Sequence, residues 1–351
     1  MDASPQVSAS RSAPARAARG ATARPILTTV FGVVLALLVA CTPAAPATPV
    51  SIPPDASSSV GPPATGTPSA APSEAAFPIT LTDDEGTTVT IPDEPERIAS
   101  LTPATTEILF ALGVEDRIVA KSEDVANYPP ESAEIPDVAT FGSVDVERIV
   151  DLETDLVVAG GNDFVPADAI ARLRTLDIPV VVVYAPDVET VFHDIELTGQ
   201  AVGEPAEAQE LADELRAEFD AVGDATEGLE PPRVFYELDA TGAIYGPADR
   251  SFLAEMIELA GGDPITTGSP DKFDIPLERL IEADPEVILL GDAAYGVTVE
   301  QVAERPGWNV MTAVREGEIR PVEDIVITRP GPRIGEGLRG LAEAIHPDLD
   351  L

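Results

Sequence analysis

Short apolar runs alternate with segments of helical spacing along most of the chain. The runs 156–159 and 179–183 are almost continuously apolar, which is typical of strands buried on both faces of a parallel sheet. Thr102 followed by Pro103 is a helix N-cap pattern, and Gly113 ends that helix. This alternation of strands and helices predicts an α/β fold.

The same pattern predicts the remaining elements and their order. We expect strands over 79–81 and 88–91 (a hairpin), 117–121, 156–159, 179–183, 233–238 and 287–290. We expect helices over 103–112, 144–152, 166–176, 187–203, 204–222, 251–260, 276–283 and 332–345. Two consecutive helices near the middle therefore divide the alternation into two series.

The two series contain an internal repeat. Residues 146–160 match residues 277–291 at an offset of 131, which pairs Glu147 with Glu278. A weaker match pairs 106–113 with 254–261 at an offset of 148, so the first series carries an insertion of 17 residues. Two like units joined by a helix predict two lobes with a ligand cleft between them. The alternative, that any two helix–strand units look alike, stays open at this point.

The N-terminal residues predict that the protein is exported from the cytoplasm. Residues 1–24 carry four Arg against Asp2, and the apolar run 25–40 ends in small residues, as in a signal peptide. The run is shorter than the ~20 residues of a spanning helix, although an uncleaved anchor stays an alternative. The residues that end at Cys41 resemble a bacterial lipobox, which implies cleavage after residue 40 and lipidation of that cysteine.

The segment that follows Cys41 is expected to be an extended tether. Residues 42–76 are almost all Pro, Ala, Ser, Thr and Gly, a composition that builds no core. We therefore expect a signal peptide over 1–40, a lipidated tether over 41–76 and a folded body from residue 77 onward.

The charge and the rare residue types exclude several classes of function. The chain has 62 Asp and Glu against 21 Lys and Arg, a net charge of −41, and loss of residues 1–40 makes it −44. Such a charge argues against nucleic-acid binding and against an electrostatic grip on anionic lipid. One Cys and two His exclude an internal disulfide and a multi-His zinc centre. The acidity also fits a soluble surface or a saline or acidic exterior.

Several motifs in order resemble one known family. They are 97–113, the sequence Asn127-Tyr-Pro-Pro130, the two Glu-Arg repeats and Arg329-Pro-Gly-Pro-Arg-Ile334. Together they resemble the iron-complex and vitamin B12 class of substrate-binding proteins of ABC importers. The resemblance implies two Rossmann-like α/β lobes, an N-terminal lobe over 77–203 and a C-terminal lobe over 226–351, bridged by a single long helix over 204–225. It implies no catalysis and no cofactor.

The resemblance also assigns roles to single residues. It implies that Glu147 and Glu278 each dock into arginine pockets of a permease dimer, which suits charge-assisted, bidentate contacts. It places aromatic residues along the cleft, and the matching positions are Phe141, Tyr245 and Phe273. The alternatives are ordinary solvated helix acids for the two glutamates and core packing for the aromatic rings.

Two polar positions and one departure bear on the ligand. Asn162 and Arg329 match cleft positions of the family, and Arg329 would favour an anionic group unless it forms a structural ion pair. Val125 stands where the family can have an aromatic residue. A His-rich cleft is absent, so zinc and manganese are disfavoured. The expected ligand is a corrinoid or a ferric siderophore, with haem as the third choice.

The expected protein is thus a monomeric lipoprotein that captures a large chelate and delivers it to an ABC permease. Contact with the membrane would be through the lipid anchor alone. A tethered enzyme is the first alternative, but the sequence has no Gly-x-Ser-x-Gly elbow, no His-Glu-x-x-His and no phosphate-binding loop. A sensor or adhesion module that kept the fold without transport is the second.

Overall fold

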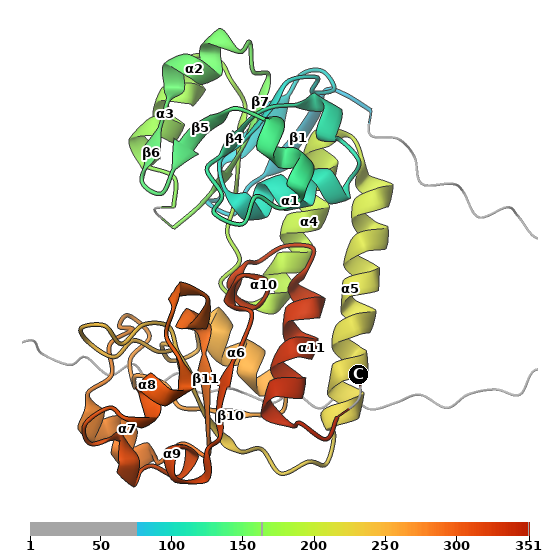
Figure 1. Cartoon of the computed structure of the whole chain (residues 1–351). Coiled ribbons are helices and arrows are strands. Elements are labelled where there is room, and N and C mark those ends of the chain that lie inside the picture. The colour runs from blue at the N-terminus through green and yellow to red at the C-terminus, as the bar shows by residue number, and fades with distance from the viewer. Residues whose placement is uncertain (1–75, 163, 350) are drawn as a thin grey trace, which may run out of the picture. The chain divides into compact units, whose positions relative to one another are not determined.

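The computed structural model describes residues 76–162, 164–349 and 351, which belong to one compact unit (Figure 1). The predicted signal peptide over 1–40, the lipidation site Cys41 and nearly all of the predicted tether lie outside these residues. In the described part of the chain, no helix combines the length and apolar character that crossing a membrane requires.

The N-terminal lobe contains a six-stranded sheet in the order β6-β5-β4-β3-β7-β8. Its strands are β3 (Ile98–Ser100), β4 (Ile118–Ser122), β5 (Asp137–Thr140), β6 (Ser143–Val144), β7 (Leu156–Gly160) and β8 (Val180–Val183). All neighbours pair in parallel except β5 and β6. The predicted hairpin forms a separate antiparallel pair of β1 (Ile79–Thr82) and β2 (Thr88–Ile91).

The C-terminal lobe contains a four-stranded parallel sheet in the order β10-β9-β11-β12. Its strands are β9 (Arg233–Glu237), β10 (Asp263–Pro264), β11 (Val287–Leu290) and β12 (Ile319–Pro321). Both β7 and β11 are fully buried, as their continuous apolar runs predict.

The helices alternate with these strands. They are α1 (Pro103–Ala111), α2 (Val146–Asp151), α3 (Ala167–Thr175), α4 (Val188–Val202), α5 (Pro205–Thr226), α6 (Phe252–Leu259), α7 (Leu277–Ala283), α8 (Val299–Ala303), α9 (Thr312–Glu316), α10 (Asp324–Thr328) and α11 (Ile334–Ile345). The predicted helices all form, with ends that shift by one or two residues in most cases. Several elements of two to five residues were not predicted, among them β10, β12 and α8 to α10.

The topology contains the internal repeat. The order β4-β3-β7-β8 in one sheet equals β10-β9-β11-β12 in the other, with α2 before β7 and α7 before β11. The extra residues of the first series fall between α1 and α2, where β5 and β6 extend the N-terminal sheet beyond β4. The similarity of the two segments is therefore structural, and chance likeness of two helix–strand units does not explain it.

The helices α4 and α5 join the two lobes (Figure 1). Gly203 adopts φ +92° between them, and a Cβ at Gly199 would collide with Ala208, so the two helices approach closely. The 22 residues of α5 make a rod about 33 Å long. It packs on α4 and on α11 of the C-terminal lobe, and one continuous apolar core includes side chains from both sheets and from these helices.

Candidate functional site

A cleft of about 1120 Å³ lies where the two lobes face each other. From the N-terminal lobe it is lined by the start of α1 and by the segments that follow β7 and β8. From the C-terminal lobe it is lined by the segment that precedes α6, by the first turn of α6, by residues 270, 271 and 273 and by the end of α10. The volume slightly exceeds the range of about 300–1,000 Å³ that is usual for small-molecule sites, so the cleft is large enough for a macrocyclic ligand.

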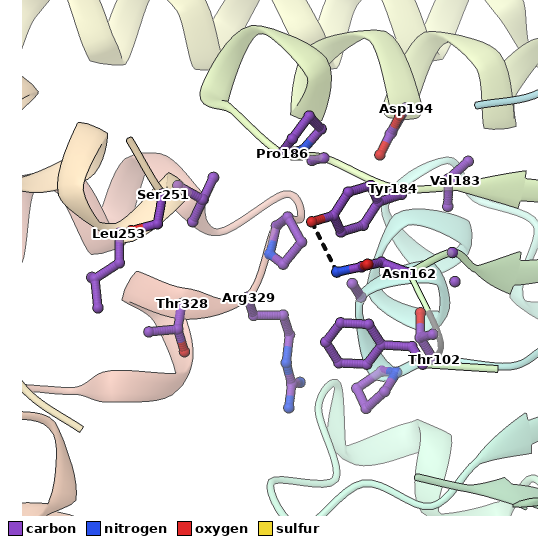
Figure 2. Close-up of a pocket in the computed structure, with 18 of the residues that line it drawn as sticks. Thr102, Asn162, Val183, Tyr184, Pro186, Asp194, Ser251, Leu253, Thr328 and Arg329 are labelled. Atoms are coloured by element: carbon purple, nitrogen blue, oxygen red, sulfur yellow. Dashed lines mark hydrogen bonds between the residues drawn. The ribbon is translucent and has the colours of Figure 1, made fainter. Parts of the chain in front are cut away.

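An amide and a phenol form the polar part of the N-terminal wall. Asn162 adopts φ +53°, and its Nδ2 donates a hydrogen bond to the Oη of Tyr184 over 3.0 Å (Figure 2). The backbone N–H of Tyr184 in turn donates to Asp84 over 2.6 Å. Tyr184 comes directly after β8 and Asn162 follows β7, so both residues lie at the cleft. The two hydrogen bonds hold the amide and the phenol in place there.

An aromatic pair extends this wall. Phe164 lines the cleft and is half exposed, and its ring meets the ring of Phe141 edge to face with centroids 5.7 Å apart. Phe141 itself is 82% exposed and is not among the residues that line the cleft. The sequence-based role of Phe141 as a ligand contact thus stays a prediction, while its neighbour Phe164 lines the cavity.

A buried acid lies behind the same wall. Asp194 on α4 lines the cleft, and burial, together with a hydrogen bond and the negative charge of Asp84, raises the pKa of Asp194 to about 9. Asp194 is therefore protonated and uncharged at neutral pH. It presents a neutral polar group where the sequence alone would place a carboxylate.

Two of the predicted aromatic residues belong to the C-terminal lobe, and only Phe273 lines the cleft. Phe273 lines the cleft and is half exposed, and its carbonyl accepts a hydrogen bond from the N–H of Gly246. Tyr245 forms single β-bridges with Asp239 and Asp274 next to that segment, but its side chain does not line the cleft. Figure 2 shows Ser251 and Thr328 on the same wall, opposite Tyr184 and Asn162.

Arg329 lines the cleft at the end of α10, and two buried acids of the N-terminal lobe bind its guanidinium. One nitrogen donates to Glu107 over 2.6 Å, and two nitrogens donate to Asp124 over 2.8 and 3.1 Å. The backbone N–H groups of Ala126 and Tyr128 also donate to Asp124. Burial alone would raise the pKa of Asp124, but these hydrogen bonds outweigh it and lower that pKa.

A second arginine completes this interlobe network. Arg333 donates to both carboxylate oxygens of Glu107 over 2.7 and 2.9 Å, and its guanidinium lies 3.6 Å from the ring centroid of Tyr128. We call Glu107, Asp124, Arg329 and Arg333 the interlobe network. It joins two acids of one lobe to two arginines of the other, so its charges balance.

The two predicted docking residues occupy equivalent helices. Glu147 lies in the first turn of α2 and Glu278 in the first turn of α7, and both side chains are exposed. In Figure 1, α2 and α7 belong to different lobes and lie away from α5. Arg172 of α3 forms an ion pair with Glu147 at 2.5 Å and lowers its pKa, chiefly by hydrogen bonding. No such pair forms at Glu278 among the described residues.

Sequence reasoning missed several residues of the site. Tyr184 stands directly after a buried strand, where the carboxyl end of a parallel strand opens into a cleft, so its position was a usable signal. Glu107 belongs to the weaker repeat, which identified the position but not its partners. Nothing local identifies Asp124, because Arg329 lies 205 positions away. No three His, Cys, Asp or Glu side chains of the described residues form a metal site.

Comparison with known proteins identifies the family. A model of the periplasmic binding protein family matches residues 98–324, which is more than half of the chain. The chain belongs to this family. Its fold is that of the class III periplasmic binding proteins, as the resemblance of its motifs predicted, and the members of the family are solute-binding proteins.

Relatives of this family protein cover most of its length. An uncharacterized ABC transporter substrate-binding lipoprotein of Bacillus subtilis, YvrC, is 31% identical over 277 residues, which are 78% of this chain and 87% of that protein. A vitamin B12-binding protein of Vibrio parahaemolyticus is 29% identical and covers 70% and 88% of the two chains. The structure of the periplasmic heme-binding protein RhuT from Roseiflexus superimposes with a TM-score of 0.64 at 27% identity, over 72% of this chain and 98% of that one.

Proposed function

We propose that the protein is an extracytoplasmic substrate-binding lipoprotein that captures a large metal chelate and delivers it to an ABC importer. The observation that carries this proposal is the interlobe cleft of about 1120 Å³, which belongs to a solute-binding fold. Its walls combine exposed aromatic edges with a few fixed polar groups, an arrangement that suits a large, flat and partly apolar ligand. The chelates in question are a corrinoid, a ferric siderophore and haem.

The names of the relatives support this range of ligands. They include a vitamin B12-binding protein and a heme-binding protein, while the lipoprotein of Bacillus subtilis is named for ABC transport. Lipidation of Cys41 would hold the folded body at the outer face of the membrane, with the Pro-rich segment as its tether. We propose binding without catalysis, in a monomer.

Direct titration tests ligand capture. The full chain, purified in detergent, is titrated by calorimetry with cyanocobalamin, with several ferric siderophores and with haem. Binding of at least one of them at micromolar concentration or tighter is the expected result. Failure of all of them to bind at that concentration would contradict chelate capture and favour a sensor or adhesion module.

Delivery to a permease rests on Glu147 and Glu278. Exposed carboxylates at the starts of two equivalent helices can each accept a bidentate contact from arginine, and the repeat places one on each lobe. The double variant Glu147→Ala with Glu278→Ala should retain ligand affinity and lose uptake. A matched control removes two exposed acids of α5, Glu210 and Glu214, and should retain both. Normal uptake by the first double variant would refute the docking role.

A further inference from the structure

The positive charge of Arg329 at the cleft is already neutralised by carboxylates of the protein. Arg329 lines the cavity, but Glu107 and Asp124 accept three hydrogen bonds from its guanidinium, and both acids are almost fully buried. The charge of Arg333 is likewise opposed by Glu107. An anionic ligand group at Arg329 would have to compete with two carboxylates already bonded in better geometry than a mobile ligand offers.

The other charged side chains at the cleft do not favour an anion either. Arg250 and Asp271 are exposed and of opposite sign. Asp249 adds an acidic side chain to the C-terminal wall, where it accepts hydrogen bonds from Thr266 and from the backbone N–H of Gly268. With Asp194 protonated, the cavity carries no excess of positive charge.

Neutral donors and acceptors supply the polarity that remains. They are the amide of Asn162, the phenol of Tyr184 and the hydroxyl groups of Thr102, Ser251 and Thr328 (Figure 2). Such groups pair well with amides, hydroxyls and carbonyls of a ligand. They do not replace the solvation that a carboxylate or a catecholate loses on entering a cavity.

We propose that Glu107 and Asp124 set the charge selectivity of the cleft, so that it takes uncharged or cationic metal chelates in preference to anionic ones. This inference rests on the proposed capture of a chelate and names the class within it. The two acids are positioning residues, because they act through Arg329 and do not line the cavity themselves. The net charge of −41 acts in the same direction, since it repels anions at low ionic strength.

Two pairs of probes that differ in charge test this selectivity. Cyanocobalamin, which is uncharged, is compared with haem, whose propionates are anionic. Ferrioxamine B, which is cationic, is compared with the anionic ferric complex of enterobactin. In each pair that binds, we expect the uncharged or cationic member to bind at least about 10-fold tighter to the full chain, with the gap widening at low salt.

Variants of the two acids separate selectivity from stability. Asp124→Asn and, separately, Glu107→Gln each remove one negative charge that opposes Arg329. Each variant should therefore lower the ratio of the two affinities within a probe pair by about 3- to 10-fold. The ratio of two affinities measured on one variant cancels any loss of folded protein. Glu237→Gln is the matched control, because Glu237 is a fully buried acid bonded by Arg305 outside the cleft, and it should leave the ratio unchanged.

The outcomes separate this inference from the proposed function. A preference for the uncharged or cationic member that narrows in both acid variants supports it. Binding of the anionic member as tightly or more tightly overturns it while chelate capture stands, and so does an unchanged ratio in Asp124→Asn and Glu107→Gln. Binding of no probe contradicts the proposed function, and this inference with it.

Discussion

The two lobes repeat one arrangement of strands but differ in what their equivalent glutamates hold. Glu107 on α1 and Glu255 on α6 correspond at the offset of 148. Each reaches the segment that follows the edge strand of the opposite sheet. Glu107 accepts from Arg329 and Arg333 after β12, whereas Glu255 accepts one backbone N–H, that of Val188, over 3.0 Å after β8.

The repeat therefore determines where each glutamate contacts the opposite lobe. The residues of the contacted segment determine how strong that contact is. The same glutamate meets two guanidinium groups in one direction and a single amide in the other. The added charges lie beside the cleft, where they govern which ligands fit. The fold therefore supplies two equivalent interlobe contacts, and only one of them carries the charge network of the binding site.

Removal of the two glutamates should give the largest and most unequal effects. Glu107→Ala leaves Arg333 without its carboxylate partner and leaves Arg329 with Asp124 alone, so we expect a loss of about 3–5 kcal/mol in the free energy of unfolding. Glu255→Ala removes one hydrogen bond to a backbone amide, with an expected loss of about 1 kcal/mol. Urea unfolding of both variants measures the difference. Equal losses would break the comparison between the lobes.

Much of the fold follows from the sequence, because buried parallel strands need continuous apolar runs and capped helices need short local signals. The elements that escaped prediction, such as β10 with two residues, are too short to have a pattern of their own and form through packing. The interlobe network could not be predicted for another reason. Arg329 was identified from its motif, but Glu107 lies 222 positions away, and only the tertiary structure brings the pair together.

The pH dependence of stability should also differ between the lobes. Burial, followed by the hydrogen bond and charge of a neighbouring acid, raises the pKa of Asp194 to about 9 in one lobe and that of Asp292 to about 7 in the other. The folded state then holds protons that the unfolded chain releases above about pH 4, so stability falls as the pH rises through each window. The fall attributable to Asp292 should end near pH 7, whereas that of Asp194 continues to about pH 9.

Amide variants test these two windows. Asp194→Asn mimics the protonated acid and should be more stable than the natural protein by about 1–3 kcal/mol at pH 9, with little difference near pH 4. Asp292→Asn should show no further gain between pH 7 and 9. Urea unfolding at pH 4, 7 and 9 gives the three values for each protein. A gain from Asp194→Asn that is independent of pH would remove the basis of this difference.

The smallest effect is expected at α2 and α7, where the equivalent residues Glu147 and Glu278 differ by one ion pair. If Glu147 and Glu278 dock as proposed, Arg172 would compete with a permease arginine for Glu147, whereas Glu278 has no such competitor among the described residues. Because an exposed pair is weak, Arg172→Ala should strengthen docking by only a few-fold and leave ligand affinity unchanged. Binding to permease in nanodiscs measures this change.

The matched control is Arg148→Ala, which removes the same charge one residue from Glu147. Arg148 is exposed and forms no ion pair with Glu147, so its loss should alter docking less than the loss of Arg172. Glu147→Ala in the Arg172→Ala background should then cost more docking affinity than Glu147→Ala does in the natural protein, because no competing ion pair weakens the contact of Glu147 there. Identical responses of the two arginine variants would show that the pair with Arg172 does not weaken docking.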